Sequence, residues 1–124
     1  MLTKNKAPLY ASYRWKKLSK RLRDTQPRFF MCWYCNVNVA TEVDHIDSRD
    51  MDKFFDMDNL VGSCSLCRQR MNENTIQPLL NTDQEPMQVA IDKAMIVNEQ
   101  YGAIGIDGFK HSVDIELLEE VWCS

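Results

Sequence analysis

The spacing of apolar residues predicts three helices. Over residues 9–24, apolar side chains recur every three or four positions with basic residues between them, and Pro8 suits a first turn. Residues 86–101 show the periodicity of a buried helix that begins at Pro86. The last segment, SVDIELLEEVW, favours a helix over residues 112–122 with Ser112 as its N-cap.

The region between the first two helices has the pattern of short strands and loops. Residues 28–35 are aromatic and apolar, which predicts a short strand that enters a turn at the first cysteine pair. Residues 36–43 alternate as a strand does, and a helix is expected to begin at or just before the sequence CSLC. Residues 46–58 are acidic without periodicity and are expected to form a loop, and residues 77–84 have the composition of a linker. We therefore predict an α+β fold with one domain over residues 1–78 and a helical extension over residues 79–124.

Positive charge is concentrated near the amino terminus, although the whole chain carries a formal charge of −3. Residues 1–30 contain nine Lys/Arg and one acid, or +8, whereas residues 31–124 contain six Lys/Arg and 17 acids, or −11. Because phosphate binding depends on the local field, the basic helix could follow a DNA backbone. The residues expected to contact nucleic acid are Arg14, Lys16, Lys17, Lys20 and Arg21. The alternative is a solvated helix face that binds nothing.

The apolar pattern also bears on the compartment. No apolar run approaches the roughly 20 residues that span a bilayer, and no hydrophobic block follows the basic start as in a secretory signal. We therefore expect a cytoplasmic protein with no membrane partner. In a reducing cytoplasm, paired cysteines are more often metal ligands than disulfides.

Two C-x-x-C pairs carry the strongest chemical pattern in the chain. Cys32 and Cys35 form one pair, Cys64 and Cys67 form the other, and 28 residues separate them. The two-residue gap lets both sulfurs of a turn face one ion, and four thiolates make a closed tetrahedral site. The pattern predicts a structural Zn²⁺ whose binding helps to fold the chain. The alternative is four cysteines that bind no metal, and Cys123 is expected to be an ordinary thiol.

Between the cysteine pairs, the segment TEVDHI places the carboxylate of Asp44 beside the imidazole of His45 at an expected strand end. Neighbouring side chains on a strand point to opposite faces, so at a bend Asp44 can face a metal while His45 faces a substrate. A packed or surface histidine is the alternative.

Together these motifs resemble the HNH endonuclease family, in particular its four-cysteine branch from phages and mobile elements. The resemblance covers about residues 10–75. The matching positions are the helix with Tyr13, Trp15 and Leu18, then Cys32-x-x-Cys35, Val43-Asp44-His45-Ile46, Phe54 to Asp58, Asn59-Leu60 and Cys64-x-x-Cys67.

The resemblance implies a ββα-metal fold, in which a β-hairpin and a helix surround a catalytic divalent ion. It implies that His45 is a general base that activates water and that Asp44 holds Mg²⁺ or Mn²⁺. Asn59 would tether the loop and orient His45 by hydrogen bonding. The implied activity is metal-dependent hydrolysis of phosphodiesters in DNA, with nicking as one form of it.

One position departs from the family pattern. The family usually has His or Asn directly after the last cysteine as a second ligand of the catalytic ion, and here that residue is Arg68. A guanidinium only donates hydrogen bonds and cannot ligate a cation. Asn72, one helical turn later, or Asp47 or another carboxylate of the acidic loop could replace the ligand. Alternatively, Arg68 could itself contact the scissile phosphate.

A further possibility is that catalysis is lost and the zinc-containing module binds nucleic acid or a protein without cleavage. The acidic remainder of the chain favours this second interpretation. For the extension, a phage or host protein is the candidate partner. The extension could instead dimerise or pack back onto the first domain.

Overall fold

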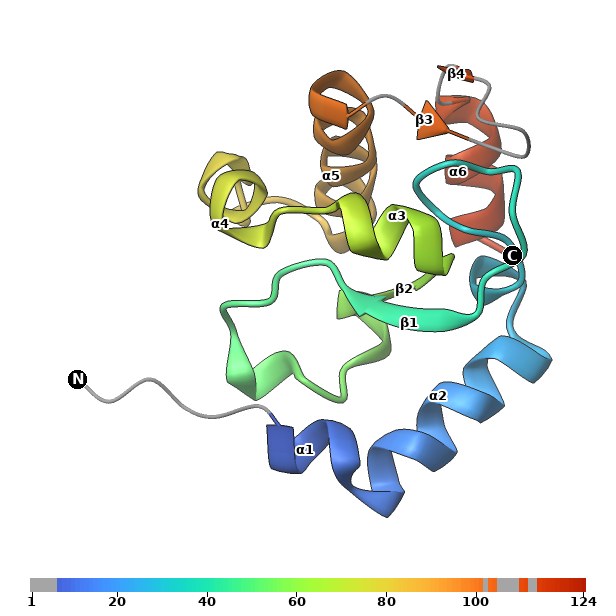
Figure 1. Ribbon diagram of the computed structural model, residues 1–124, viewed down its shortest axis with the longest axis vertical. Coiled ribbons are helices and arrows are strands. Elements are labelled where there is room, and N and C mark those ends of the chain that lie inside the picture. Colours follow the sequence, from blue (N-terminus) through green and yellow to red (C-terminus); the bar gives the residue numbers. More distant parts are fainter. Residues whose placement is uncertain (1–6, 102, 105–109, 112–113) are drawn as a thin grey trace.

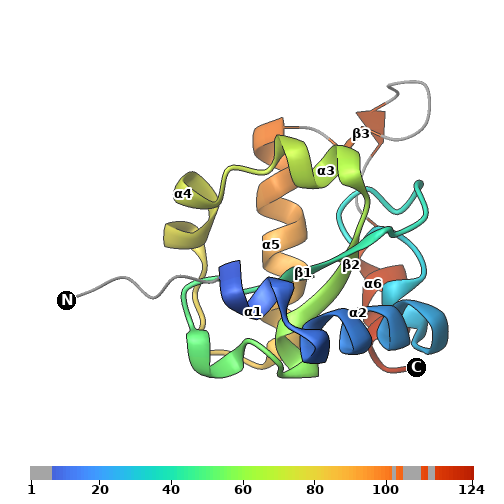
Figure 2. The ribbon, with the colours of Figure 1, turned by 60° about the horizontal axis from the view of Figure 1, so that its bottom comes forward.

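The computed structural model describes residues 7–101, 103–104, 110–111 and 114–124. Strands β1 (Glu42–His45) and β2 (Leu60–Ser63) form a two-stranded antiparallel sheet in which Asp44 lies opposite Val61 and His45 opposite Leu60. Helix α2 (Tyr13–Thr25) lies on one side of this sheet, and helix α5 (Pro86–Tyr101) lies on the other (Figures 1 and 2). With the cluster of four cysteines described below, the predicted small α+β fold is confirmed at this level.

The amino-terminal helix is interrupted, contrary to the single helix predicted over residues 9–24. It consists of α1 (Ala7–Ala11) and α2, with Ser12 between them in an extended conformation. The Ser12 hydroxyl accepts a hydrogen bond from the backbone N–H of Trp15 at 3.2 Å. Serine at an N-cap satisfies one of the donors that a helix start leaves free, so the chain begins a new helix here.

The strands predicted over residues 28–35 and 36–43 are wrong in position. Residues Pro27–Phe29 form the 3₁₀ turn η1, and an isolated bridge between Met31 and Val39 is the β pairing before β1. The first cysteine turn curls the backbone, since the N–H of Asn36 donates to the carbonyl of Cys32 at 2.9 Å and Asn36 has a φ of 59°. The aromatic and apolar residues here are buried around a turn. Periodicity alone does not distinguish such a buried turn from a strand.

Several other predictions agree with the structure. Helix α3 (Ser65–Arg70) begins directly after Cys64, and α5 has its predicted bounds.

The acidic loop contains the 3₁₀ turns η2 (Met51–Lys53) and η3 (Met57–Asn59), and α4 (Glu73–Ile76) and η4 (Gln77–Leu79) follow α3. Strands β3 (Ala103–Ile104) and β4 (Lys110–His111) pair antiparallel ahead of α6 (Ile115–Trp122).

The N-cap of α6 differs from the predicted Ser112. Asp114 is the cap, and its side chain accepts from the N–H of Leu117 at 3.1 Å. Ser112 lies outside the described residues, as does most of the glycine-rich stretch 102–108.

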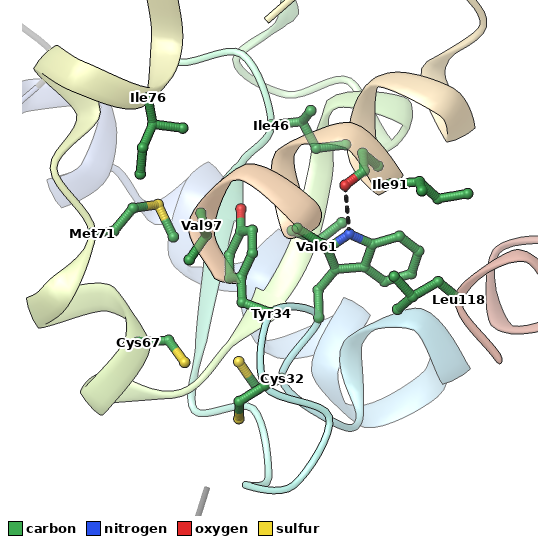
Figure 3. Close-up of a cluster of buried hydrophobic side chains, with 14 of the residues drawn as sticks. Cys32, Tyr34, Ile46, Val61, Cys67, Met71, Ile76, Ile91, Val97 and Leu118 are labelled. Carbon is green, nitrogen blue, oxygen red and sulfur yellow. Dashed lines mark hydrogen bonds between the residues drawn. The ribbon is translucent and has the colours of Figure 1, made fainter. Parts of the chain in front are cut away.

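Two hydrophobic clusters lie on opposite faces of the sheet. On the face toward α2, the buried side chains are Trp15, Leu22, Phe29, Val43, Phe54 and Leu60. On the other face, Trp33, Ile46 and Val61 join buried residues of α5 and Leu118 of α6. Figure 3 shows part of this second cluster, and its dashed line is the 2.9 Å hydrogen bond from the Trp33 indole to the carbonyl of Ala90. The carboxyl-terminal helices therefore share a core with the cysteine turns.

The helices within the described ranges do not suit a bilayer interior. None of them combines the length and the apolar character needed to cross it.

Gly62 is the point where the sheet comes closest to its neighbours. A Cβ atom at this position would lie 2.8 Å from the Cβ of Ala40 and 2.9 Å from the Cα of Phe29. We expect Gly62→Ala to destabilise the fold by about 1–3 kcal/mol, because the contacting backbone of Phe29 cannot move aside freely. Urea unfolding measures this loss. Ala40→Gly added to Gly62→Ala removes the contact with the Ala40 Cβ but not the contact with Phe29, so it should restore only part of the stability. Equal stability of Gly62→Ala and the wild type would contradict the close approach.

Candidate functional site

The four paired cysteines converge in the fold. Cys32, Cys35, Cys64 and Cys67 are all buried, and their sulfur atoms lie within 4.8 Å of one another. In Figure 3 the side chains of Cys32 and Cys67 face one another at one end of the core cluster. This arrangement can hold a metal ion, so that part of the prediction is confirmed. Cys123 is exposed near the carboxyl terminus.

The second cysteine turn is held by the start of α3. The Cys64 sulfur accepts from the N–H of Cys67 at 3.4 Å and from the side-chain amide of Asn38 at 3.5 Å. Such donors stabilise a thiolate, as they would any anion at a helix start. Hydrogen bonding with the neighbouring thiols raises the pKa of Cys32 and lowers the pKa of Cys35.

Asp44 and His45 point to opposite faces of β1, as the strand geometry predicted. His45 lies on the face toward α2, where its ring stacks on that of Trp15 with centroids 5.0 Å apart and an interplanar angle of 17°. Asp44 lies on the face toward α5. Both side chains are buried, with 4% of each residue exposed.

His45 is held by a hydrogen bond at each ring nitrogen. Its Nε2 lies 2.9 Å from the carbonyl oxygen of Phe54, which can only accept, so Nε2 carries the proton. Its Nδ1 then accepts from the Tyr10 hydroxyl at 3.2 Å. Burial and the nearby Asp44 raise the pKa of Tyr10, which keeps that hydroxyl protonated. The ring is therefore fixed in one tautomer, with its basic nitrogen covered by Tyr10 of α1.

Asn59 ties together the loop between the strands. Its carbonyl oxygen accepts from the N–H of Asp47 at 2.8 Å, and its amide donates to the carbonyls of Asp47 at 3.0 Å and Lys53 at 3.3 Å. The loop it closes also contains Phe54, whose carbonyl orients His45. The Asn59 side chain thus tethers the loop through its hydrogen bonds to Asp47 and Lys53.

Asp44 is surrounded by donors. The Tyr34 hydroxyl donates to Oδ2 at 2.5 Å, the Lys93 ammonium lies 3.1 Å from Oδ2, and the Arg68 Nε lies 3.7 Å from Oδ1. Burial alone would raise the pKa of Asp44, but Lys93 and Arg68 outweigh burial and lower it. Burial and the charge of Asp44 raise the pKa of Tyr34 well above its usual value, so this hydroxyl remains a donor.

Lys93 is fully buried, with no exposed surface. Besides Asp44, its ammonium donates to the carbonyl of His45 at 2.6 Å and lies 3.5 Å from Oε1 of Glu73. The ammonium is also 5.7 Å from the centroid of the Tyr34 ring. Thus three oxygen groups and one aromatic face surround one cationic atom.

Sequence reasoning missed Lys93, Tyr34 and Glu73. A pattern for Lys93 was present, since it lies four positions after Val89 and four before Val97, both buried, and so falls on the buried face of α5. Its partner could not be found in this way, because 48 positions separate Lys93 from the nearest oxygen, that of His45.

The substitute ligands considered for a catalytic ion lie elsewhere. Helix α3 ends at Arg70, so Asn72 is not on its face, and the Asn72 oxygen instead accepts from the N–H of Asn74 at 3.1 Å. Asp47 accepts from the N–H and the Nε of Arg49, both at 3.0 Å. The prediction that Asn72 lies one helical turn past Arg68 on the same face is wrong, because α3 ends two residues before Asn72.

The residues around Asp44 do not fit a divalent ion. An ammonium already lies against Oδ2 and a guanidinium faces Oδ1, and neither group can ligate a cation. A Mg²⁺ or Mn²⁺ ion needs oxygen ligands at about 2.0–2.1 Å around it, and the space beside Asp44 is taken by Lys93.

The predicted basic residues gather on the exposed face of α2. Those residues are Arg14, Lys16, Lys17, Lys20 and Arg21, and all of them are exposed. Three of them, Arg14, Lys17 and Arg21, line a cavity of about 240 Å³ together with Leu18 and Phe55. The Arg14 guanidinium lies 3.8 Å from the centroid of the Phe55 ring.

A second cavity lies between α2 and β1. It has a volume of about 340 Å³ and is lined by Tyr10, Trp15, Ser19, Thr41, Glu42, Val43 and Arg68. Arg68 thus reaches from the buried carboxylate of Asp44 to a space beside the basic helix.

No protein-family model, curated protein or solved structure matches the chain. Inferences about function therefore rest on the residues and geometry of the site.

The Asp44–Lys93 pair should be strongly coupled energetically. We expect Lys93→Met and Asp44→Asn each to lower the free energy of unfolding by roughly 3–5 kcal/mol, because each removes the closest partner of a buried charge and leaves the cluster with one charge in excess. The double variant should recover part of that loss, which a double-mutant cycle from urea unfolding would measure. Lys20→Met, which removes a solvent-exposed pair with Asp24, is the control and should have little effect. Additive losses would contradict direct pairing.

Proposed function

We propose that this protein is a DNA-binding module with an HNH-like ββα core, held together by a structural zinc ion, that binds without cleaving. The observation that carries the proposal is the exposed basic face of α2 beside the Arg14–Phe55 cavity, combined with a neutralised Asp44 on the other face of β1.

Zinc is the ion best supported by the cysteine geometry. A tetrahedral site with Zn–S bonds of about 2.3 Å places its sulfurs about 3.8 Å apart. The Cys35 and Cys64 sulfurs lie 3.9 Å apart. Bound zinc would supply structural cross-linking of the two cysteine turns and no reactive position, since all four ligands come from the protein.

The order of elements supports the HNH-like assignment of the core. Strand β1, strand β2 and helix α3 follow one another in the chain, with the cysteine pairs before β1 and around the start of α3. The tie that Asn59 makes to the backbone of Asp47 is in keeping with the loop-tethering role that the resemblance implies for it. The HNH-like assignment of the core is thus supported by local geometry and by sequence motifs.

The surface of α2 suits a polyphosphate backbone. Five exposed cations on one helix produce a local positive field despite the net charge of −3. The cavity also contains the Phe55 ring with the Arg14 guanidinium 3.8 Å from its centroid, and bases stack on such aromatic and guanidinium groups in sites that bind single strands. The acidic remainder of the chain would confine the contact to this face.

The geometry favours binding over cleavage. Metal-dependent hydrolysis needs an ion on the Asp44 carboxylate, and that carboxylate is paired with Lys93 and Arg68. A general base needs access to water, and His45 is buried with Nδ1 on the Tyr10 hydroxyl. The endonuclease activity stays a prediction that a plasmid-cleavage assay can test.

Purified protein should contain one zinc ion per chain by elemental analysis, and a chelator should unfold it. The reason is that structural zinc sites contribute on the order of 10 kcal/mol to folding. Cys67→Ser should lose zinc and structure together, whereas Cys123→Ser, which lies outside the cluster, should keep both. A folded protein without metal would refute the zinc site.

Charge reversal on α2 should weaken DNA binding. We expect the double variant Lys17→Glu/Arg21→Glu to lose roughly tenfold or more in affinity, and to lower the slope of log affinity against log salt by about two. Fluorescence anisotropy with labelled duplex and single-stranded DNA measures both. Arg70→Glu, at an exposed position on α3, is the matched control and should bind as the wild type does.

The same preparations should leave supercoiled plasmid intact in Mg²⁺ or Mn²⁺. Nicking by the wild type that disappears in His45→Ala would overturn the non-cleaving proposal and support the endonuclease. Equal DNA affinity of the wild type and the α2 double variant would instead overturn the binding surface.

A further inference from the structure

The Lys93 ammonium lies among groups that are typical ligands of a cation. Oδ2 of Asp44 is at 3.1 Å, the carbonyl oxygen of His45 at 2.6 Å, and Oε1 of Glu73 at 3.5 Å from Nζ. Two carboxylates and a backbone carbonyl are hard oxygen donors, the type that Mg²⁺, Mn²⁺ and Ca²⁺ prefer.

An independent observation comes from Glu73. Its Oε2 accepts from the side chains of Gln77 and Ser48, so that half of the carboxylate is fixed in place. Its Oε1 is buried and makes no hydrogen bond with the described residues, although it lies within ion-pair distance of Lys93 and Arg68. Buried polar atoms are usually hydrogen-bonded, so Oε1 is an oxygen that could take a further close ligand.

The ammonium is a permanent part of the core. Lys93 lies in the middle of α5, between the buried Ala90 and Ala94, and the carbonyl of Ala90 accepts from the Trp33 indole at 2.9 Å. Withdrawing Lys93 would require α5 to leave the hydrophobic cluster that it shares with the cysteine turns. A side chain that leaves its position to let an ion bind would instead extend from a mobile or exposed segment.

We propose that Lys93 is the protein's own cation at this position, and that the same oxygen atoms form a divalent-cation site once its ammonium is removed. Its single charge offsets Asp44, and its N–H donors satisfy the His45 carbonyl, so the fold does not require a bound ion here. A side chain of α5 thereby occupies the position that an ion from solution would otherwise take.

The proposal explains how Arg68 is accommodated next to Asp44. With a divalent ion on Asp44, a guanidinium 3.7 Å from the same carboxylate would face an added charge of +2. With an ammonium instead, Asp44 and Glu73 balance Lys93 and Arg68 as two negative and two positive groups. The buried cluster is then neutral as a whole.

The test is Mn²⁺ binding to Lys93→Ala, measured by calorimetry and electron paramagnetic resonance on zinc-loaded protein. Mn²⁺ is a suitable probe because it binds thiolates weakly and leaves a zinc site intact. We expect Lys93→Ala to bind Mn²⁺ at least 100-fold more tightly than the wild type. At a Mn²⁺ concentration of about 100 times Kd, Tm should rise by about 5 °C or more.

Two controls separate a cation site from a simple cavity. Lys93→Met removes the charge but keeps the volume filled, so it should bind no Mn²⁺. Asp44→Asn added to Lys93→Ala removes the main ligand and should abolish binding. Folded Lys93→Ala that binds no Mn²⁺, or binds it equally well with Asn at position 44, would overturn the proposal, as would tight binding of Mn²⁺ by the wild type at Asp44.

If Lys93→Ala does not fold without a ligand, a rescue experiment tests the proposed cation site. The substitution removes three carbons and the nitrogen, so n-propylammonium carries the missing atoms. Refolding in Mn²⁺ or in n-propylammonium, but not in uncharged n-propanol, supports a site that requires a cation. Failure of both cations to restore the fold would refute it. None of these measurements uses DNA, so their outcome is independent of the binding proposal.

Discussion

The buried contact between Lys93 and the end of β1 joins the two parts of this protein. One ammonium donates to the backbone of His45 and pairs with the side chain of Asp44, and it comes from a helix 48 positions further along the chain. Removing a charge from water costs several kcal/mol, and good geometry with additional hydrogen bonds is needed to offset that cost. Tyr34 and Glu73 help to meet this requirement, so α5 has one well-defined position against the sheet.

This contact also constrains the chemistry of the site. A carboxylate and an imidazole on adjacent positions of a strand reach opposite faces, and in this fold each face has its own environment. His45 is enclosed by aromatic rings and hydrogen bonds on the α2 side, whereas Asp44 is enclosed by cations on the α5 side. The scaffold that the motifs indicate is thus combined with surroundings that favour a structural role for Asp44.

The cysteine cluster and the Lys93 pair lie beside the same hydrophobic core, which contains the four cysteines and buried residues of α5 on both sides of Lys93. The sulfurs bring together two turns separated by 28 residues, and between them the chain forms the hairpin that displays Asp44 and His45. The basic helix α2 then covers the outer face through Trp15 and Leu22 and leaves its cations exposed. In this arrangement Lys93 lies on the other face of the sheet from α2, whereas Arg68 also lines the cavity between α2 and β1.

The sequence by itself determined features that depend on residues close together in the chain. The two C-x-x-C turns, the helix after Cys64, the bounds of α5, and the opposite directions of Asp44 and His45 all follow from short-range spacing. The break at Ser12 was also readable in principle, because a serine N-cap is a local feature. The strands around the first cysteine pair were misplaced, since buried aromatic residues in a turn show no period that separates them from a strand.

Only the tertiary structure decided what surrounds Asp44. Spacing could place Lys93 on the buried face of α5, but it could not pair that ammonium with a carboxylate 49 positions away in β1. The same holds for Tyr34 and Glu73, whose contacts with this cluster depend on how the hairpin, the cysteine turns and α5 pack together. The physical reason is that the motif specifies which side chains can hold a cation, whereas packing between distant segments determines which cation lies there.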